Sequence, residues 1–396
     1  MVYRMTEWIE CTLDKLGEIV GGATPSTKCE DYYGGSIPWI TPKDLSSFKG
    51  RYITSGERNI TEKGLASCSA QMMPKDAVLF TSRAPIGYVA IASQSVCTNQ
   101  GFKSIVVNDK ADPLFVYYLL KYNKDAIEAM GSGTTFKEVS GKTMRAVKVR
   151  IPLDVSYQKR IAAVLDSLDT KIENSERIND NLQQQLFSLY ENMATASPCL
   201  KEYTLSNLCD FQEGYVNPPQ THPEYFDGEV KWLRAVDINE SFIIETSRTL
   251  TKAGFESAKK SALLFEPNTI AISKSGTIGR LGIIADYMCG NRAVINIAPH
   301  DTNMLAFIYC FLKSKQREFP DMAVGSVQKN LYVSLLEPLS VSIPDNESLT
   351  AFNAVGASIL GMIHNNCVEN TDLANLRDTI LPKLMSGEID VSSVLL

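Results

Sequence analysis

The sequence predicts an α+β protein in which two globular, mixed α/β domains are separated by two long antiparallel helices that form a coiled coil, with a pseudo-twofold internal repeat. Three observations predict this fold. The chain repeats itself at an offset of about 192 residues. Each copy is rich in short strand-like runs bounded by turn residues. Each copy is also followed by a long heptad pattern.

The repeat is carried by matching landmarks at nearly constant spacing. An aromatic pair, a glycine, a tryptophan and an acid recur together, at 32–45 and again at 225–238. Further matches are Ile86-Gly87 with Ile278-Gly279, Cys97 with Cys289, Asn99 with Asn291, Gly133 with Gly325, Lys137 with Lys329, and Ile151-Pro152 with Ile343-Pro344. Such a shared register indicates two copies of one domain.

Within the first copy, the runs 77–80, 88–92 and 103–107 are rich in Val, Ile and Phe and predict strands. Helical patterns follow at 113–130 and, in the second copy, at 303–318. The repeated tryptophans, Trp39 and Trp232, are expected in the cores because a large ring between strand residues buries well.

A heptad seam follows each Ile-Pro pair. The first seam is Ile161, Leu165, Leu168, Ile172, Ser175, Asn179, Leu182, Leu186, Leu189 and Met193. The second, weaker seam is Phe352, Gly356, Ile359, Ile363, Asn366, Asn370, Leu373, Arg377, Ile380 and Leu384.

The polar layers of the two seams predict how the helices pair. Antiparallel packing would place Ile161 opposite Leu384 and Met193 opposite Phe352. It would also place Ser175 and Asn179 opposite Asn370 and Asn366, so that buried amides face polar partners. Roughly 36 residues at ~1.5 Å each would give a rod of about 50 Å that holds the domains apart. The alternative is two separate surface helices with incidental polar breaks.

Composition limits the class of protein. The 396 residues suffice for two or three domains, and no stretch is apolar enough for a membrane span or a signal peptide. Nine cysteines without a Cys-x-x-Cys pair predict reduced thiols in a cytoplasmic protein. The net charge is −6 and the helical segments are acidic, which suits a protein partner, so DNA would need local basic patches on the domains.

Candidate DNA contacts are loop positions that recur in both copies with different chemistry, together with Lys43 and Arg234, which lie just after the repeated tryptophans. The major groove favours Arg or Lys on guanine and Asn or Gln on adenine, and lysines often contact phosphates. The candidates are Lys43, Thr81, Ser82, Arg83, Lys137, Arg234, Ser273, Lys274, Ser275, Gln328, Lys329 and Asn330, with Phe136 beside Lys137. Each could equally be part of a solvated turn. Asn99 and Asn291 are unchanged in type between the copies, which favours turn capping.

Other site types find little support. Ser140-Gly141-Lys142-Thr143 lacks the glycine that a phosphate-binding loop requires, because Phe136 stands there. His222, His300 and His364 have no metal-ligand spacing. Asn217-Pro218-Pro219-Gln220 resembles the Asn-Pro-Pro-aromatic signature of adenine methyltransferases, but Gln220 replaces the aromatic residue that stacks on a flipped base. Pro218 also takes the repeat position of Pro25, which favours a proline-stiffened turn.

The order of domain, helix, domain, helix resembles the specificity subunit of type I restriction-modification enzymes. The residues that carry the resemblance are Gly22-Ala23-Thr24-Pro25-Ser26, Gly35 to Trp39, Gln158, Ile172 to Asn174 and the C-terminal stretch from Leu376 to Ile389. The resemblance implies target recognition domains at 1–152 and 201–344 and helical spacers at 153–200 and 345–396. Each domain would bind half of a bipartite DNA target.

The resemblance also implies a non-catalytic subunit that binds no cofactor itself. Two methyltransferase subunits, which carry S-adenosylmethionine, would dock on the helices. Two restriction and translocase subunits, which use ATP and Mg²⁺, would complete the complex on double-stranded DNA, with no membrane involved. Two alternatives stay open: an autonomous adenine-N6 DNA methyltransferase that uses Asn217, and a scaffold that recruits partners without binding DNA.

Overall fold

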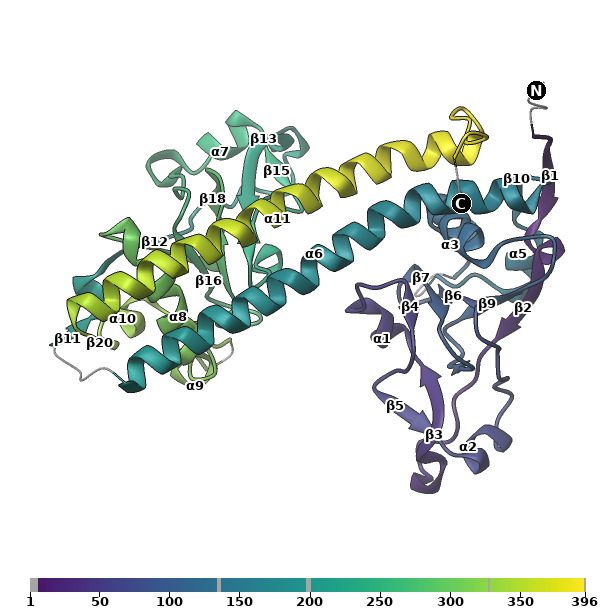
Figure 1. Cartoon of the computed structure of the whole chain (residues 1–396), viewed down its shortest axis with the longest axis horizontal. Helices are drawn as coiled ribbons and strands as arrows, with labels where there is room; N and C mark the ends of the chain where they lie inside the picture. Colours follow the sequence, from purple (N-terminus) through teal and green to yellow (C-terminus); the bar gives the residue numbers. More distant parts are fainter. Residues whose placement is uncertain (1–5, 134–136, 197–200, 327, 395–396) are drawn as a thin grey trace. The chain divides into compact units, whose positions relative to one another are not determined.

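A computed structural model describes residues 6–133, 137–196, 201–326 and 328–394 (Figure 1). By its internal contacts the chain divides into two compact units: unit 1 is Met1–Glu173 with Leu373–Leu396, and unit 2 is Asn174–Asp372. Each unit therefore contains one copy of the repeat together with a part of each long helix.

The first copy, in unit 1, is a mixed α/β domain. Its strands are β1 (Trp8–Thr12), β2 (Gly17–Gly21), β3 (Tyr33–Ile40), β4 (Tyr52–Ile53), β5 (Arg58–Ile60), β6 (Val78–Ser82), β7 (Ile86–Ala92), β8 (Cys97–Thr98), β9 (Lys103–Val107) and β10 (Lys148–Pro152). They form a five-stranded sheet in the order β2-β9-β6-β7-β4, a three-stranded sheet β5-β3-β8 and the pair β1-β10. Its helices are α1 (Pro42–Ser46), α2 (Glu62–Ala66), α3 (Pro113–Tyr122), α4 (Lys124–Ala129) and α5 (Gly141–Ala146).

The second copy, in unit 2, repeats this topology. Its strands are β11 (Lys201–Thr204), β12 (Cys209–Glu213), β13 (Phe226–Leu233), β14 (Phe242–Ile243), β15 (Thr249–Leu250), β16 (Ile270–Ser273), β17 (Leu281–Ile284), β18 (Cys289–Gly290), β19 (Val294–Pro299) and β20 (Ser340–Ile343). The sheets are β12-β19-β16-β17-β14, β15-β13-β18 and β11-β20, strand for strand the order of the first copy. Its helices are α7 (Lys252–Glu256), α8 (Leu305–Lys315), α9 (Phe319–Met322) and α10 (Val333–Leu336).

The repeated tryptophans are core residues, as the sequence predicts. Trp39 and Trp232 are buried. Each indole Nε1 donates a hydrogen bond to a backbone carbonyl, that of Ala23 at 3.0 Å and that of Val216 at 2.7 Å. The rings therefore fasten the three-stranded sheet to the segment that precedes it in both copies.

Two predicted helices are shorter than the sequence suggests. The helix expected over 113–130 is divided into α3 and α4, because the Asn123 side-chain amide donates to the Leu119 carbonyl at 2.8 Å and ends the first helix. Its counterpart expected over 303–318 begins with a 3₁₀ turn, where the Asp301 carboxylate accepts a bond from the Asn303 amide, and α8 starts only at Leu305.

The two long helices are α6 (Val155–Ala196) and α11 (Asn346–Ser386), and within each unit part of α6 lies alongside part of α11 (Figure 1). In unit 1, Ile161, Leu165 and Leu384 are buried in one hydrophobic core with α3. In unit 2, Leu186 and Phe352 share a second core with α8, and Met193 packs against it.

One position of the predicted seam is wrong. Leu189 is exposed, and Tyr190 is buried in its place. The Tyr190 ring meets Phe307 edge-on at a centroid distance of 5.5 Å and Phe352 at 6.1 Å. The end of α6 packs against α8 as well as α11, so the helix turns its buried face toward both neighbours and departs from the strict heptad spacing.

Candidate nucleic-acid interface

Three backbone hydrogen bonds join four segments of the first copy. The amide of Asn99 donates to the carbonyl of Ile40 at 3.0 Å, that of Ser82 to Gly101 at 2.7 Å, and that of Val139 to Ser82 at 3.0 Å. The segments that follow β3, β6 and β8 are thereby tied to the segment before α5. We call them the loop edge of unit 1, residues 40–46, 82–86, 99–102, 132–133 and 137–139.

The second copy contains the same frame. The amide of Asn291 donates to Leu233 at 2.9 Å, that of Lys274 to Ala293 at 2.7 Å, and that of Leu331 to Lys274 at 2.9 Å. The loop edge of unit 2 consists of residues 233–238, 273–280, 291–294, 324–326 and 328–331. In each unit the predicted DNA contacts within the described residues, Thr81 excepted, therefore belong to one connected edge although they are far apart in the sequence.

The candidates of unit 1 that reach solvent are cationic. The side chain of Lys43 is 78% exposed, and its amine lies 2.7 Å from the Glu57 carboxylate. Arg83 lies 3.6 Å from Glu138, and Lys137 is exposed on the adjoining loop. That loop is closed by paired bonds between Ser132 and Glu138. Phe136 lies outside the described residues.

Three candidates prove to be buried. The side chains of Thr81, Ser82 and Ser273 have no exposed surface, and each is bonded to nearby backbone. Thr81 Oγ1 accepts from the Tyr88 amide at 2.8 Å, and Ser82 donates to the Gly101 carbonyl at 3.2 Å. Ser273 Oγ accepts from the Arg280 amide at 2.8 Å. Their prediction as DNA contacts is corrected, since these hydroxyls hold the turns and cannot reach a ligand.

Lys274 is held by neighbours of its own unit. Its amine lies 2.7 Å from Glu213 and 4.8 Å from the centre of the Tyr332 ring, and its side chain is 14% exposed. Burial raises the pKa of Glu213, but hydrogen bonds from Lys274 and Tyr215 outweigh it and leave that pKa below its ordinary value. The carboxylate therefore stays charged and fixes the Lys274 ammonium.

The other candidates of unit 2 belong to the same loop edge. Arg234 donates from Nη2 to Ser247 at 2.5 Å, and its guanidinium lies 5.6 Å from the centre of the Trp232 ring. Ser275 is half-buried. On the neighbouring loop Gln328 and Lys329 are exposed and Asn330 is half-buried, so this part of the edge presents amide and ammonium groups to solvent.

The repeated asparagines cap turns, which confirms that prediction. Asn99 Oδ1 accepts from the Gly101 amide at 2.8 Å, and Asn291 Oδ1 accepts from the Ala293 amide at 3.0 Å. The residues at the tips of these turns, Gln100 and Arg292, are exposed and were missed by sequence reasoning. Their signal was present, because they share a repeat position and differ in chemistry.

A polar layer joins α6 to α11 in unit 2. Asn366 Nδ2 donates to Asn179 Oδ1 at 2.7 Å, and Asn179 Nδ2 lies 3.6 Å from Cys367 Sγ. Ser175 Oγ and Asn370 Oδ1 are buried and find no hydrogen-bond partner among the described residues. One bond of this layer therefore fixes the alignment of the two helices in this unit.

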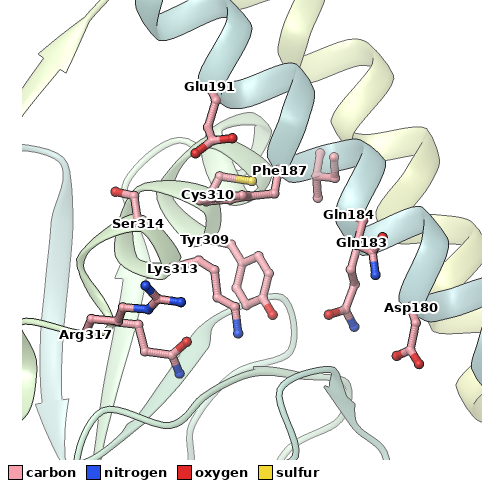
Figure 2. Close-up of a pocket in the computed structure, with 12 residues that line it drawn as sticks. Asp180, Gln183, Gln184, Phe187, Glu191, Tyr309, Cys310, Lys313, Ser314 and Arg317 are labelled. Atoms are coloured by element: carbon pink, nitrogen blue, oxygen red, sulfur yellow. The ribbon is translucent and has the colours of Figure 1, made fainter.

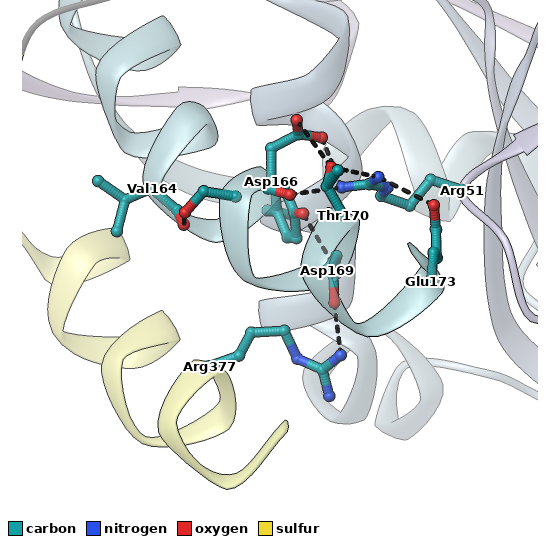
Figure 3. Close-up of polar contacts among 9 residues, drawn as sticks. Arg51, Val164, Asp166, Asp169, Thr170, Glu173 and Arg377 are labelled. Carbon is teal, nitrogen blue, oxygen red and sulfur yellow. Dashed lines mark hydrogen bonds and ion pairs between the residues drawn. The ribbon is translucent and has the colours of Figure 1, made fainter. Parts of the chain in front are cut away.

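A buried ionic network fastens the first copy to α6 in unit 1 (Figure 3). Arg51, only 6% exposed, donates to Asp166 Oδ1 at 2.6 Å, to Thr170 Oγ1 at 2.9 Å and to Glu173 Oε2 at 3.1 Å. Asp169 on the same helix accepts from Tyr118 at 2.7 Å. It also pairs with Arg377 of α11 at 2.6 Å. Arg377, which appeared to weaken the seam, is thus an ionic partner within it.

A hollow of about 740 Å³ lies between α6 and α8 in unit 2 (Figure 2). Its walls mix charged and polar side chains with Phe187 and Tyr309. Lys313 is held by Glu240 at 2.5 Å. Opposite charges on the same walls favour neither an anionic nor a cationic ligand.

Neither a metal-binding cluster nor a membrane-spanning helix is found in the described ranges. Among those residues no group of three or more His, Cys, Asp and Glu side chains is placed to hold a metal ion. His222 stacks on Tyr225 and His364 meets Phe242 edge-on. None of the helices, as far as the chain is described, is both long and apolar enough to cross a membrane.

Comparison with known proteins identifies the repeat. The family model for the type I restriction modification DNA specificity domain matches residues 5–184 and 200–371. The chain is 32% identical over 412 residues to the type I restriction enzyme MjaIX specificity subunit of Methanocaldococcus jannaschii, covering 98% of this chain and 95% of that protein. It is 23% identical to the type I restriction enzyme EcoBI specificity subunit of Escherichia coli, covering 96% and 86%.

A solved structure shares the fold. The crystal structure of a type I restriction-modification system S subunit from M. genitalium superposes with a TM-score of 0.58 at 16% sequence identity, covering 97% of each chain. With two matches to the family model and a relative aligned along nearly its whole length, the chain belongs to the family of type I restriction-modification specificity subunits.

Proposed function

We propose that each copy of the repeat binds one half of a bipartite DNA target through its loop edge. One observation carries the proposal: both copies contain the same three-bond backbone frame, but the side chains mounted on it differ. Unit 1 presents Lys43, Arg83, Gln100 and Lys137, whereas unit 2 presents Arg292, Gln328 and Lys329. Two frames with different side chains suit two half-targets of different sequence.

Footprinting tests this proposal. The full chain, purified with its methylating partner, should protect two blocks of DNA separated by several base pairs. Protection of one contiguous stretch would contradict bipartite recognition.

A scaffold that recruits partners without binding DNA makes a different prediction for the loop edges. Arg83→Ala and Lys329→Ala should weaken DNA binding, because each removes a cation that reaches solvent at a loop edge. If affinity for DNA is unchanged in both variants and in the double variant, the edges do not bind DNA. Lys201→Ala, which removes an exposed cation outside both edges, is the matched control.

The helices are proposed to dock methyltransferase subunits, two per chain, with two restriction and translocase subunits completing the complex. In unit 2, exposed apolar side chains recur on both helices: Ile178 and Leu189 on α6, Val355 and Met362 on α11. In the alignment given by the Asn179–Asn366 bond, Leu189 lies level with Val355. Exposed apolar groups on two adjacent helices are typical of a protein interface.

The docking surface is tested by charge insertion. Met362→Glu should abolish co-purification with the methylating subunit and leave the circular dichroism spectrum unchanged. Asn365→Glu adds the same charge at an exposed polar position of α11 and should preserve co-purification. Equal behaviour of the two variants would exclude Met362 from the interface.

The chain is further proposed to be non-catalytic and to bind no cofactor, with S-adenosylmethionine, ATP and Mg²⁺ on its partners. Calorimetric titration of the isolated chain with S-adenosylmethionine should give no binding heat. Saturable binding would revive an autonomous methyltransferase that uses Asn217.

A further inference from the structure

A second hollow of unit 2, about 590 Å³ in volume, adjoins its loop edge. It brings together side chains from three separate segments of the second copy. Its chemistry comes from Tyr215, Asn217, His222, Tyr225, Lys259 and Arg292, and from Glu256, whose carboxylate pairs with Lys252 at 3.7 Å. The Asn-Pro-Pro-Gln stretch therefore forms part of its wall.

Two insertions of the second copy meet at this hollow. Gly22 and Gly214 occupy equivalent positions, because each packs against the end of the same strand, β8 or β18. Ala23 and Val216 are also equivalent, because each accepts the hydrogen bond from the repeated tryptophan. Tyr215 therefore has no counterpart in the first copy. Met73 pairs with Val96, and Phe265 pairs with Met288, in equivalent isolated β-bridges of the two copies. The stretch from the end of α7 to Phe265 is two residues longer than the stretch from the end of α2 to Met73. This longer stretch contains the 3₁₀ turn Lys259–Ser261, whose first residue lines the hollow.

In the first copy the corresponding side chains bond to one another. Thr24 Oγ1, at the repeat position of Asn217, donates to Gln100, which holds the repeat position of Arg292. The second copy has Asn217 and Arg292 exposed instead. Arg292 has no hydrogen bond or ion pair with any residue that the structure describes. The two copies therefore differ in the side chains that they present at this place.

The lining has the chemistry of a nucleotide site. The Tyr215 ring is 49% exposed, and its hydroxyl donates to Glu213 at 2.8 Å, which fixes the ring in place. His222 and Tyr225 also line the hollow and stack on each other, with ring centroids 4.9 Å apart and planes 19° from parallel. Aromatic rings bind bases by stacking, Arg292 and Lys259 can bind phosphate, and the Asn217 amide can donate to and accept from a base edge.

The position of the hollow links it to bound DNA. Arg292 lies between Asn291 and Ala293, whose backbone groups bond to Leu233 and Lys274 of the loop edge. A base stacked in a duplex offers only its edges, so its faces reach aromatic rings only after the base leaves the stack. Given the proposed function, we propose that this hollow receives one nucleotide of the bound DNA whose base has left the helical stack.

The test uses the full chain with its methylating partner. The target is first obtained from the positions methylated in a genome that carries the complete system. Duplexes then carry 2-aminopurine, whose fluorescence rises when it unstacks, at each successive position of the target. One position should brighten several-fold on binding. The signal should be lost in Tyr215→Ala and retained in Tyr215→Phe, which keeps the ring.

Charge is tested with neighbouring lysines. Lys259→Ala should weaken the signal, whereas Lys260→Ala removes the same charge outside the hollow lining and should leave it unchanged. A nucleotide flipped by the methylating subunit also brightens, but that signal survives Tyr215→Ala. If no position brightens, or if every bright position survives Tyr215→Ala, the proposal is overturned.

Two further measurements distinguish a nucleotide of bound DNA from a free nucleotide, and failure of this proposal from failure of the proposed function. Titration of the full chain with dAMP and dTMP, followed by intrinsic fluorescence, detects a free-nucleotide site. Saturation there without a Tyr215-dependent signal in DNA would overturn the proposal in favour of a free ligand. Footprints of the same complexes test the proposed function by itself: an intact bipartite footprint without brightening overturns only the hollow's role.

Discussion

The attachment of the first copy to α6 depends on a single residue, Arg51. Its guanidinium is almost fully buried and bonds to three residues of α6. Arg51→Met should lower the free energy of unfolding by about 3 kcal/mol, because it leaves Asp166 and Glu173 without their cation. Chemical denaturation of the full chain would measure the loss in the transition that reports on unit 1.

The control is Arg58→Met, which removes a guanidinium that lies 4.4 Å from the Tyr33 ring and has an exposed side chain. It should cost less than about 1 kcal/mol. An Arg51 variant no less stable than this control would show that the network contributes nothing to stability.

The cysteines should differ in reactivity according to burial. Burial raises the pKa of Cys97, Cys209, Cys289 and Cys310 to about 12, so their thiolates are scarce at neutral pH. Iodoacetamide should alkylate the less buried Cys29 well before these four, as mass spectrometry of the native chain would show. Rapid labelling of all five in the folded state would contradict the burial.

Sequence patterns located the loop edges but not the exposure of single residues. Thr81, Ser82 and Ser273 look like polar turn residues, yet all five residues of β6 and all four of β16 are buried. Both strands lie inside five-stranded sheets, where the usual alternation of buried and exposed positions is lost. Gln100 and Arg292 could have been found by applying the repeat comparison to the turns that Asn99 and Asn291 cap.

At the scale of elements, two glycines of α11 make opposite predictions. A Cβ at Gly356 would lie 2.6 Å from Ala306 Cβ, so this glycine allows α11 to pack closely against α8. A Cβ at Gly361 would meet no atom within 4 Å. Gly356→Ala should destabilise unit 2 by about 1–3 kcal/mol. Gly361→Ala should stabilise it by about 0.5–1 kcal/mol, since alanine favours the helix.

Thermal unfolding of both variants measures the difference, and each serves as the control for the other. Equal shifts in the same direction would mean that the close approach at Gly356 does not limit packing.

The polar layer between the helices makes a second prediction at this scale. Asn179 and Asn366 share a bond within a largely apolar contact, so a double-mutant cycle with Leu at both positions should give a coupling energy of about 1 kcal/mol. Either single change should destabilise unit 2 because it leaves one amide unpaired. Additive effects would show that the two amides do not interact in solution.

The sequence predicted the long helices and their alignment, but not every residue in their contact or every helix break. The heptad pattern cannot indicate that Tyr190 replaces Leu189 in the contact, because that exchange depends on Phe307 from a distant helix. Nor could it reveal the break at Asn123, which depends on a side chain bonding back to its own helix.

For the whole molecule, the central prediction is that each copy recognises a different half of the DNA target. Arg83→Ala should lower the affinity for the unaltered target. It should also reduce discrimination against base changes in one half of the target only. Arg292→Ala should relax discrimination in the other half. Each change should cost about tenfold in affinity or more if the arginine contacts a base. Binding measured against libraries randomised in one half at a time would separate the two effects.

If both variants relax the same half, the two copies do not read separate parts of the target. A uniform loss of affinity without loss of discrimination would assign both arginines to phosphates.

The backbone frame of the loop edges has a consequence for how such a protein can change over generations. Its three bonds use only main-chain amides and carbonyls, which every residue except proline provides. Mutations at the tips of the turns can therefore change the side chains offered to DNA without breaking the backbone bonds that hold the loop edge together. New target preferences become accessible by small, separate steps, and the length differences near Tyr215 and Lys259 show that two copies of one fold can also differ in their turns.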